Sequence, residues 1–262
     1  MIKKKAAVVL CAGVGSRMGL PINVNKCAIQ INETSAVRHT VVSLINIGCE
    51  LIVIVVGHAQ ESVKEALREI NVPGNCELQY VFNEYYGYHG CNYSVACGVL
   101  YAAERFNNVV ITEGDSLLHP DSFRQVGCSD TNAALLIRAE SFIDPGRSVV
   151  AIGIEGQINR HYYNQEHTEV LPALTSNEFI LGESMQLWSY SDEPLQQLYL
   201  NLKAYKEMAD KSKTPLLESG VFSINMVDSP IVPVISSNPT LWINLNTQDD
   251  LVKAREQEWL LG

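Results

Sequence analysis

Basic residues are scarce in this chain of 262 residues. Lys and Arg number 19 against 29 Asp and Glu, which gives a net charge of −10. The one basic run is Lys3–Lys5. Such an acidic protein is poorly suited to a nucleic-acid backbone, whereas a local positive site for a small anion is compatible with it. No apolar stretch approaches the length of a membrane span, so neither a nucleic acid nor a membrane is expected as a partner.

Paired cysteine motifs are also missing. The chain has seven cysteines, an odd number, and no Cys-x-x-Cys spacing among them. This pattern disfavours a disulfide framework or a zinc site and favours free thiols in a reducing cytoplasm. No repeat, low-complexity tract or linker divides the sequence, so a single domain over residues 1–262 is expected.

The first half of the chain alternates between apolar strands and amphipathic helices. Continuous apolar runs such as 51–58 are typical of the interior of a parallel sheet. The expected strands are 5–12, 51–58, 76–83 and 108–115, and the expected helices are 34–48, 60–70 and 93–106. This order predicts an α/β fold with a doubly wound, mostly parallel, Rossmann-like sheet.

The second half reads differently. Apolar segments 133–140, 148–163 and 179–191 are expected to form strands joined by turns, with a hairpin at Glu155 and Gly156. A helix over 193–209, strands over 231–236 and 241–246, and a helix over 248–261 complete the prediction. We interpret this part as a mixed β extension of the parallel sheet.

A glycine loop follows the first strand directly, in the sequence LCAGVGSRMG. Small residues let backbone N–H groups approach phosphates, so phosphate and dinucleotide loops are the first alternatives. The P-loop pattern G-x-x-x-x-G-K-[ST] is absent. The glycines Gly13, Gly15 and Gly19 are spaced G-x-G-x-x-x-G, and the second strand ends in Gly57-His58 without an acid for a ribose. A dinucleotide-dependent oxidoreductase is therefore disfavoured.

The same loop resembles the signature L-x-A-G-x-G-[ST]-R-M of sugar-1-phosphate nucleotidyltransferases, in which a lysine follows about ten residues later. Lys26 stands at that place, and Asn25 replaces the proline that often precedes the lysine. The resemblance implies a catalytic Arg17 at the β- and γ-phosphates and a catalytic Lys26 at the α-phosphate. It implies that the nucleotide contacts Leu10, Ala12, Gly13, Gly15 and Ser16. The competing interpretation is an ordinary turn with a surface Arg and Lys.

Two acids end the strand over 108–115. Glu113 and Asp115 come at its carboxyl end, where ligand sites of open α/β sheets lie. The resemblance implies that Asp115 binds Mg²⁺ and that Glu113 belongs to the nucleotide site. "EGD" is typical of the branch that transfers cytidylyl groups to phosphocholine and phosphonates. The closing segment 241–254 resembles that of the family, and Asn246 stands where an Asp often provides a second metal ligand.

Further candidates precede and follow this strand. The resemblance implies that Asn92 and Ser94 lie beside the base and ribose, while their residue types also suit a helix N-cap. Arg138, Arg147, Arg160 and His161 lie in the extension, where each is either an acceptor-binding cation or a solvated surface charge.

The resemblance to this branch of the family implies a cytidylyltransferase. It would move CMP from CTP to a small phosphonate or phosphate monoester, with Mg²⁺ as cofactor and release of pyrophosphate. Residues 1–130 would bind the nucleotide, and residues 131–262 would bind the anionic acceptor and supply the closing strand and helix. A sugar-1-phosphate uridylyltransferase and a non-catalytic nucleotide-binding relative are the alternatives. A cytoplasmic location is expected, and a homodimer is left open.

Overall fold

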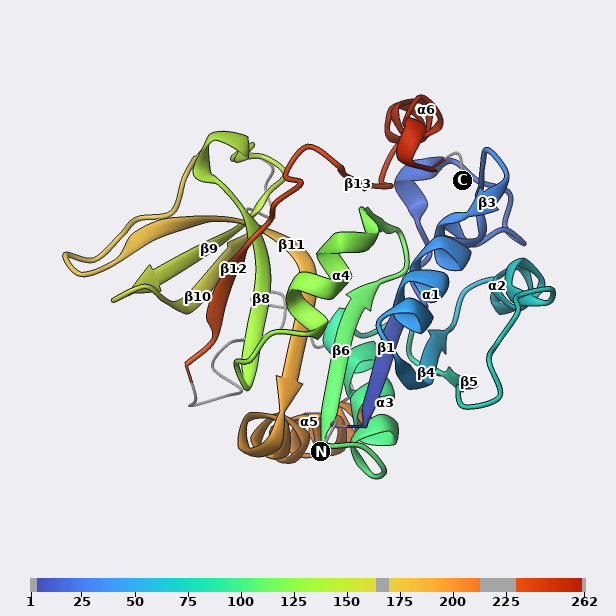
Figure 1. Cartoon of the computed structure of the whole chain (residues 1–262), viewed down its shortest axis with the longest axis horizontal. Helices are drawn as coiled ribbons and strands as arrows, with labels where there is room; N and C mark the ends of the chain where they lie inside the picture. Colours follow the sequence, from blue (N-terminus) through green and yellow to red (C-terminus); the bar gives the residue numbers. More distant parts are fainter. Residues whose placement is uncertain (1–3, 164–169, 213–229, 261–262) are drawn as a thin grey trace.

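A single nine-stranded sheet runs through the computed structural model, which describes residues 4–163, 170–212 and 230–260 (Figure 1). Its strands follow the order β10-β9-β11-β6-β1-β4-β5, and β8 joins it beside β11 with β12 at its other side. The predicted doubly wound, mostly parallel arrangement with a mixed extension is confirmed.

The parallel half consists of four strands that were all predicted. They are β1 (Lys5–Cys11), β4 (Cys49–Val56), β5 (Glu77–Phe82) and β6 (Asn108–Glu113). Every neighbouring pair in the order β6-β1-β4-β5 is parallel. All seven residues of β1 are buried, which explains its continuous apolar sequence: helices cover the sheet on both faces.

The helices divide between the two faces. Side chains of α1 (Ala36–Asn46), α2 (Gln60–Leu67) and α4 (Pro120–Gly127) pack on one face, and those of α3 (Cys91–Ala103) and α5 (Asp192–Lys211) pack on the other. Because side chains alternate along a strand, Val8 and Leu10 of β1 face α3, whereas Ala7, Val9 and Cys11 face α1.

The mixed extension forms the left side of the molecule in Figure 1. It contains β8 (Ala133–Arg138), β9 (Val149–Ile154), β10 (Gln157–Tyr163), β11 (Phe179–Ser191) and β12 (Val232–Ile235). β11 runs antiparallel to β6 and so joins the two halves. The predicted hairpin is confirmed: Glu155 and Gly156 have φ of 52° and 80°, the left-handed values that a two-residue turn of this kind requires.

Several local features differ from the prediction. No element was predicted over 116–127, which forms β7 (Ser116–Leu118) and α4. The short hairpin of β2 (Gln30–Ile31) and β3 (Thr34–Ser35) was also missed. Gly90 caps α3, so the N-cap interpretation of Asn92 and Ser94 is wrong: both lie inside its first turns.

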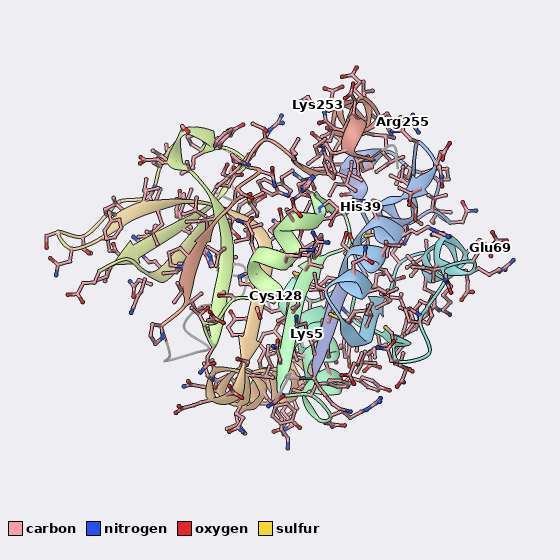
Figure 2. The ribbon with its side chains drawn as sticks, in the orientation of Figure 1. Lys5, His39, Glu69, Cys128, Lys253 and Arg255 are labelled. Atoms are coloured by element: carbon pink, nitrogen blue, oxygen red, sulfur yellow. The ribbon has the colours of Figure 1, made fainter. Side chains whose placement is uncertain are left out.

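The last elements of the chain pack beside the segment that follows β1. β13 (Trp242–Asn244) pairs antiparallel with β7, and α6 (Gln248–Arg255) packs on Met18 and Ile29, which follow β1. Figure 2 shows Lys253 and Arg255 on this helix at the top of the view, away from Lys5 and Cys128 in the central part. The predicted helix over 248–261 ends at Arg255 and is followed by a 3₁₀ turn, Glu258–Leu260. In the described ranges, no helix combines the length and apolarity needed to cross a membrane.

Candidate active site

The glycine loop leaves β1 at its carboxyl end and closes in one 3₁₀ turn, Ser16–Met18. Gly15 and Gly19 flank that turn with φ of 64° and 60°, a backbone region that strongly favours glycine. A Cβ on Gly15 would also press on the side chain of Lys26, 3.3 Å from its Cδ. Gly13, Ser16 and Arg17 are exposed, so the loop presents its backbone and one guanidinium to solvent.

Asn25 positions Lys26 through a buried network. Its Nδ2 donates to the carbonyl oxygens of Cys11 at 2.9 Å and His58 at 2.8 Å, and its Oδ1 accepts from the Cys27 N–H at 2.9 Å. The side chain therefore joins the ends of β1 and β4 to the 3₁₀ turn Lys26–Ala28. In the sequence, this role was indicated by the asparagine at position 25, which replaces the proline that often precedes the lysine in the family signature.

Lys26 and Asp115 form an ion pair at the carboxyl end of the sheet. Their side chains are 18% and 4% exposed. Burial alone would lower the pKa of Lys26, but neighbouring groups, with the carboxylate of Asp115 foremost and that of Glu113 in addition, together hold the pKa above its ordinary value. The ammonium is therefore charged at neutral pH. Apart from this ammonium, the Oδ2 of Asp115 receives no hydrogen bond from the described residues.

The pair lines a cavity of about 300 Å³. This cavity is lined by seven of the site residues predicted from the sequence: Leu10, Ala12, Gly13, Lys26, Ser94, Glu113 and Asp115. The glycine loop, the strand-end acids and the first turns of α3 thus converge on one cavity. Gly15, Ser16, Arg17, Asn92 and Asn246 lie outside its lining.

Arg17 and Asn246 contact each other beside this cavity. Nη2 of Arg17 donates to Oδ1 of Asn246 at 2.9 Å. The backbone N–H of Leu245 donates to the carbonyl oxygen of Asp115 at 3.0 Å, which brings the segment after β13 to the strand-end acid. Asn246 directly follows Leu245 in the sequence, and its amide oxygen points to Arg17.

The oxygen donors of this region suit Mg²⁺. The part of the chain that the structure describes has no group of three or more His, Cys, Asp or Glu side chains that would suit a metal ion. Mg²⁺ is commonly held by one or two carboxylates together with substrate phosphates. The carboxylate of Asp115 and the amide oxygen of Asn246 fit that chemistry, with the phosphates supplying the remaining charge.

An aromatic wall of the cavity comes from the stretch 85–90, whose residues were not proposed individually for the site. Tyr86 and His89 line it together with Gly90 and Cys91. His89 is buried, its Nε2 lies 3.1 Å from the carbonyl oxygen of Ala209, and its ring stacks on Tyr93 with centroids 5.5 Å apart. The hydroxyl of Tyr93 donates to Asp210 at 2.5 Å. The wall is therefore fixed by the end of α5, which is far away in the sequence.

Three of the predicted basic residues of the extension, Arg138, Arg147 and Arg160, have acidic neighbours. Nε of Arg138 donates to Glu183 at 2.6 Å, and its guanidinium lies between the rings of Phe142 and Trp242. Nε of Arg160 donates to Glu178 at 2.7 Å. Burial raises the pKa of Glu183, whereas Arg160 lowers the pKa of Glu178 to about 2. None of the four predicted basic residues, Arg138, Arg147, Arg160 and His161, lines the cavity of Lys26.

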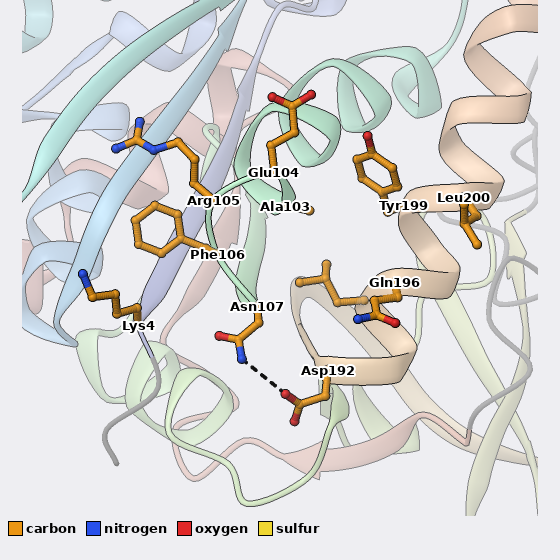
Figure 3. Close-up of a pocket in the computed structure, with 11 residues that line it drawn as sticks. Lys4, Ala103, Glu104, Arg105, Phe106, Asn107, Asp192, Gln196, Tyr199 and Leu200 are labelled. Atoms are coloured by element: carbon orange, nitrogen blue, oxygen red, sulfur yellow. Dashed lines mark hydrogen bonds between the residues drawn. The ribbon is translucent and has the colours of Figure 1, made fainter.

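A second, larger cavity of about 790 Å³ lies at the opposite, amino end of the strands (Figure 3). It is lined by the end of α3 and the start of α5, where Asn107 donates a hydrogen bond to Asp192 at 3.4 Å. None of the residues nominated from the sequence lines it. The residues predicted for the site therefore line the smaller of these two cavities.

Sequence comparison matches residues 7–150 to the family described as the MobA-like NTP transferase domain. The bifunctional protein GlmU of Corynebacterium aurimucosum is 31% identical over 130 residues, which are 49% of this chain and 26% of that protein. The chain thus spans about a quarter of the length of this curated relative.

Two solved structures share the fold across nearly the whole chain. The CTP:phosphocholine cytidylyltransferase of Streptococcus pneumoniae superposes with a TM-score of 0.68 and 16% identity, covering 97% of this chain and 98% of that one. The inositol-1-phosphate CTP transferase of T. maritima gives a TM-score of 0.62 and 16% identity, covering 97% of both chains.

Proposed function

Since this chain belongs to the family of MobA-like NTP transferase domains, we propose that it transfers CMP from CTP to a small phosphate monoester or phosphonate. The observation that carries the proposal is the Lys26–Asp115 pair, which lies between a glycine loop and the first turns of α3 in one cavity. A charged ammonium and a strand-end carboxylate are the groups that a triphosphate and its cation require.

Different residues would bind different parts of the triphosphate. Gly13, Gly15 and Ser16 would offer backbone and hydroxyl donors to its oxygens. Arg17 would bind the β- and γ-phosphates, and Lys26 would stabilise the charge that builds up at the α-phosphate. An acceptor oxyanion would attack the α-phosphorus in line, while the bond to the bridging oxygen breaks and pyrophosphate leaves with the electron pair. The acceptor is ionised at neutral pH, so alignment and charge neutralisation suffice.

Asp115 and Asn246 would hold the Mg²⁺ ion. When bound, such an ion neutralises the charge of the phosphates and orients them. The proposal is supported by the position of Asp115 in the cavity lining and by the backbone contact between Asp115 and Leu245, the neighbour of Asn246.

The choice of CTP and of the acceptor class is supported by the two solved structures that share the fold, a CTP:phosphocholine cytidylyltransferase and an inositol-1-phosphate CTP transferase. Ser94, Glu113, Leu10 and Ala12 line the cavity and would surround the base and ribose, with Asn92 in the adjoining turn of α3. A buried donor or acceptor left unpaired by the wrong base costs about 1–3 kcal/mol, which is enough for discrimination between pyrimidines.

Pyrophosphate release tests this proposal directly. The protein is incubated with Mg²⁺, each of CTP, UTP, GTP and ATP, and small phosphate monoesters and phosphonates as separate acceptors. CTP should exceed UTP and ATP by at least about ten-fold in kcat/KM, equivalent to roughly 1.4 kcal/mol. Equal use of UTP would refute the cytidylyl assignment while keeping the reaction class. No release with any pair would refute the transferase itself.

A further inference from the structure

Each cation expected to bind the triphosphate contacts an oxygen expected to bind the metal. Lys26 pairs with the carboxylate of Asp115, and Arg17 donates to the amide oxygen of Asn246. Each of the two side chains expected to bind phosphate is thus paired with a side chain expected to bind the metal. The triphosphate can use a cation fully only if its oxygen partner releases it, and a divalent ion can use an oxygen fully only if its cation releases it.

The charges of Lys26 and Asp115 sum to zero. A nucleotide without metal therefore meets an ammonium whose charge is already neutralised, and a metal ion without nucleotide meets a carboxylate whose charge is already neutralised. The low exposure of both side chains makes this pairing matter, because buried charges are screened less than surface charges. Metal and nucleotide together supply a new partner for each group, so neither charge is left alone.

The backbone around the two pairs is tied to one segment. Leu245 donates to the carbonyl oxygen of Asp115 at 3.0 Å, and Nε2 of Gln248 donates to the carbonyl oxygen of Met18 at 2.6 Å. The strand-end acid and the glycine loop are therefore held by the same stretch before and at the start of α6. Exchange of partners then needs side-chain rearrangement but no separation of these elements.

We propose that Asp115 and Asn246 mask Lys26 and Arg17, and that this masking makes the binding of CTP and of Mg²⁺ interdependent. The proposal rests on the proposed function, because it assigns these four side chains to a nucleotide and its metal. It has an unusual consequence. Asp115→Asn, which should stop turnover, should strengthen the binding of CTP in the absence of metal.

Isothermal titration calorimetry with CTP, in EDTA and in MgCl₂, measures this without relying on turnover. For the parent protein, Mg²⁺ should strengthen CTP binding by at least about ten-fold. In EDTA, Asp115→Asn should bind CTP about ten-fold more tightly than the parent does, since the removed pair is buried. The gain from Mg²⁺ should be largely lost in this variant.

Two further variants separate masking from simple repulsion between a carboxylate and the phosphates. Glu113→Gln removes a carboxylate from the same cavity but leaves the Lys26–Asp115 pair, so masking predicts a smaller gain in EDTA than with Asp115→Asn. Asn246→Ala changes no charge and releases Arg17, so masking alone predicts tighter metal-free binding. Circular dichroism confirms that each variant is folded.

The outcomes distinguish the two proposals. Equal gains for Asp115→Asn and Glu113→Gln, or no gain for Asp115→Asn, would overturn the masking while the parent still binds CTP with Mg²⁺. Failure of the folded parent to bind CTP with and without Mg²⁺ would overturn the proposed function, and the masking with it.

Discussion

Replacing Lys26 by Met should damage both turnover and stability. The change keeps the length and apolar stem of the side chain and removes only the charge. Among the described residues that line the cavity, Lys26 is the one Lys or Arg, so no neighbour replaces it there. Loss of one preorganised charge contact costs about 3–4 kcal/mol in the transition state, which corresponds to a kcat lower by about 10²- to 10³-fold.

The stability effect follows from the burial of the partner. Asp115 is 4% exposed, and Lys26→Met leaves its carboxylate without a counterion. Breaking a buried pair on one side costs about 3–5 kcal/mol. At about 2–4 °C per kcal/mol for a chain of this size, the melting temperature should fall by about 6–20 °C. The double variant Lys26→Met/Asp115→Asn should recover most of that loss, because the orphaned charge is gone.

Thermal unfolding by circular dichroism and single-turnover pyrophosphate release measure the two effects separately. Lys253→Met is the matched control, since Lys253 is exposed on α6 and should change neither quantity appreciably (Figure 2). A Lys26→Met protein as stable as the parent would refute the pairing argument. A double variant whose loss equals the sum of the single losses would refute the coupling of the two side chains.

Two other predictions concern the fold. Gly98→Ala places a Cβ against Val8 and Val55, so it should destabilise the protein by about 1–3 kcal/mol in urea unfolding, whereas an unchanged midpoint would contradict the tight packing of α3 on the sheet. Arg160 lowers the pKa of Glu178 from 4.5 to about 2, so the contribution of this pair to stability is present above pH 4.5 and is lost as the pH falls toward 2. Glu178→Gln should flatten the pH dependence of the melting temperature in that interval, and an unaltered profile would contradict it.

The parallel half could be predicted because its signals are local. β1 and β4 are continuous apolar runs between turn residues, and the βα alternation then fixes the class of fold. The stretch 116–127 was missed for a physical reason. β7 has three residues and exists because β13, more than 120 residues later, pairs with it. A strand that short carries too little periodicity to be recognised without its partner.

The residues of the candidate site also divide into those that local motifs predict and those that depend on contacts between distant parts of the chain. Lys26 and Asp115 stand in contiguous motifs, and the carboxyl ends of parallel strands bring those motifs together. Tyr86 and His89 were not proposed individually, and His89 is fixed in the wall by a contact with Ala209 near the end of α5, which the local sequence does not reveal. The contact between Arg17 and Asn246 joins residues 229 positions apart and depends on the antiparallel pairing of β13 with β7.

The two departures from the family signature now have physical explanations. Asn25 is fully buried and uses both its oxygen and its nitrogen to fix the turn that carries Lys26. A proline there would pre-set the backbone by its ring, whereas the asparagine does so by hydrogen bonds. Asn246 orients Arg17 and retains an oxygen that suits Mg²⁺. Because Asn246 brings no charge to the predicted metal position, it is the feature on which the alternative of a non-catalytic relative would rest, and the pyrophosphate assay tests that alternative. We favour the transferase, in which these asparagines position its two cations.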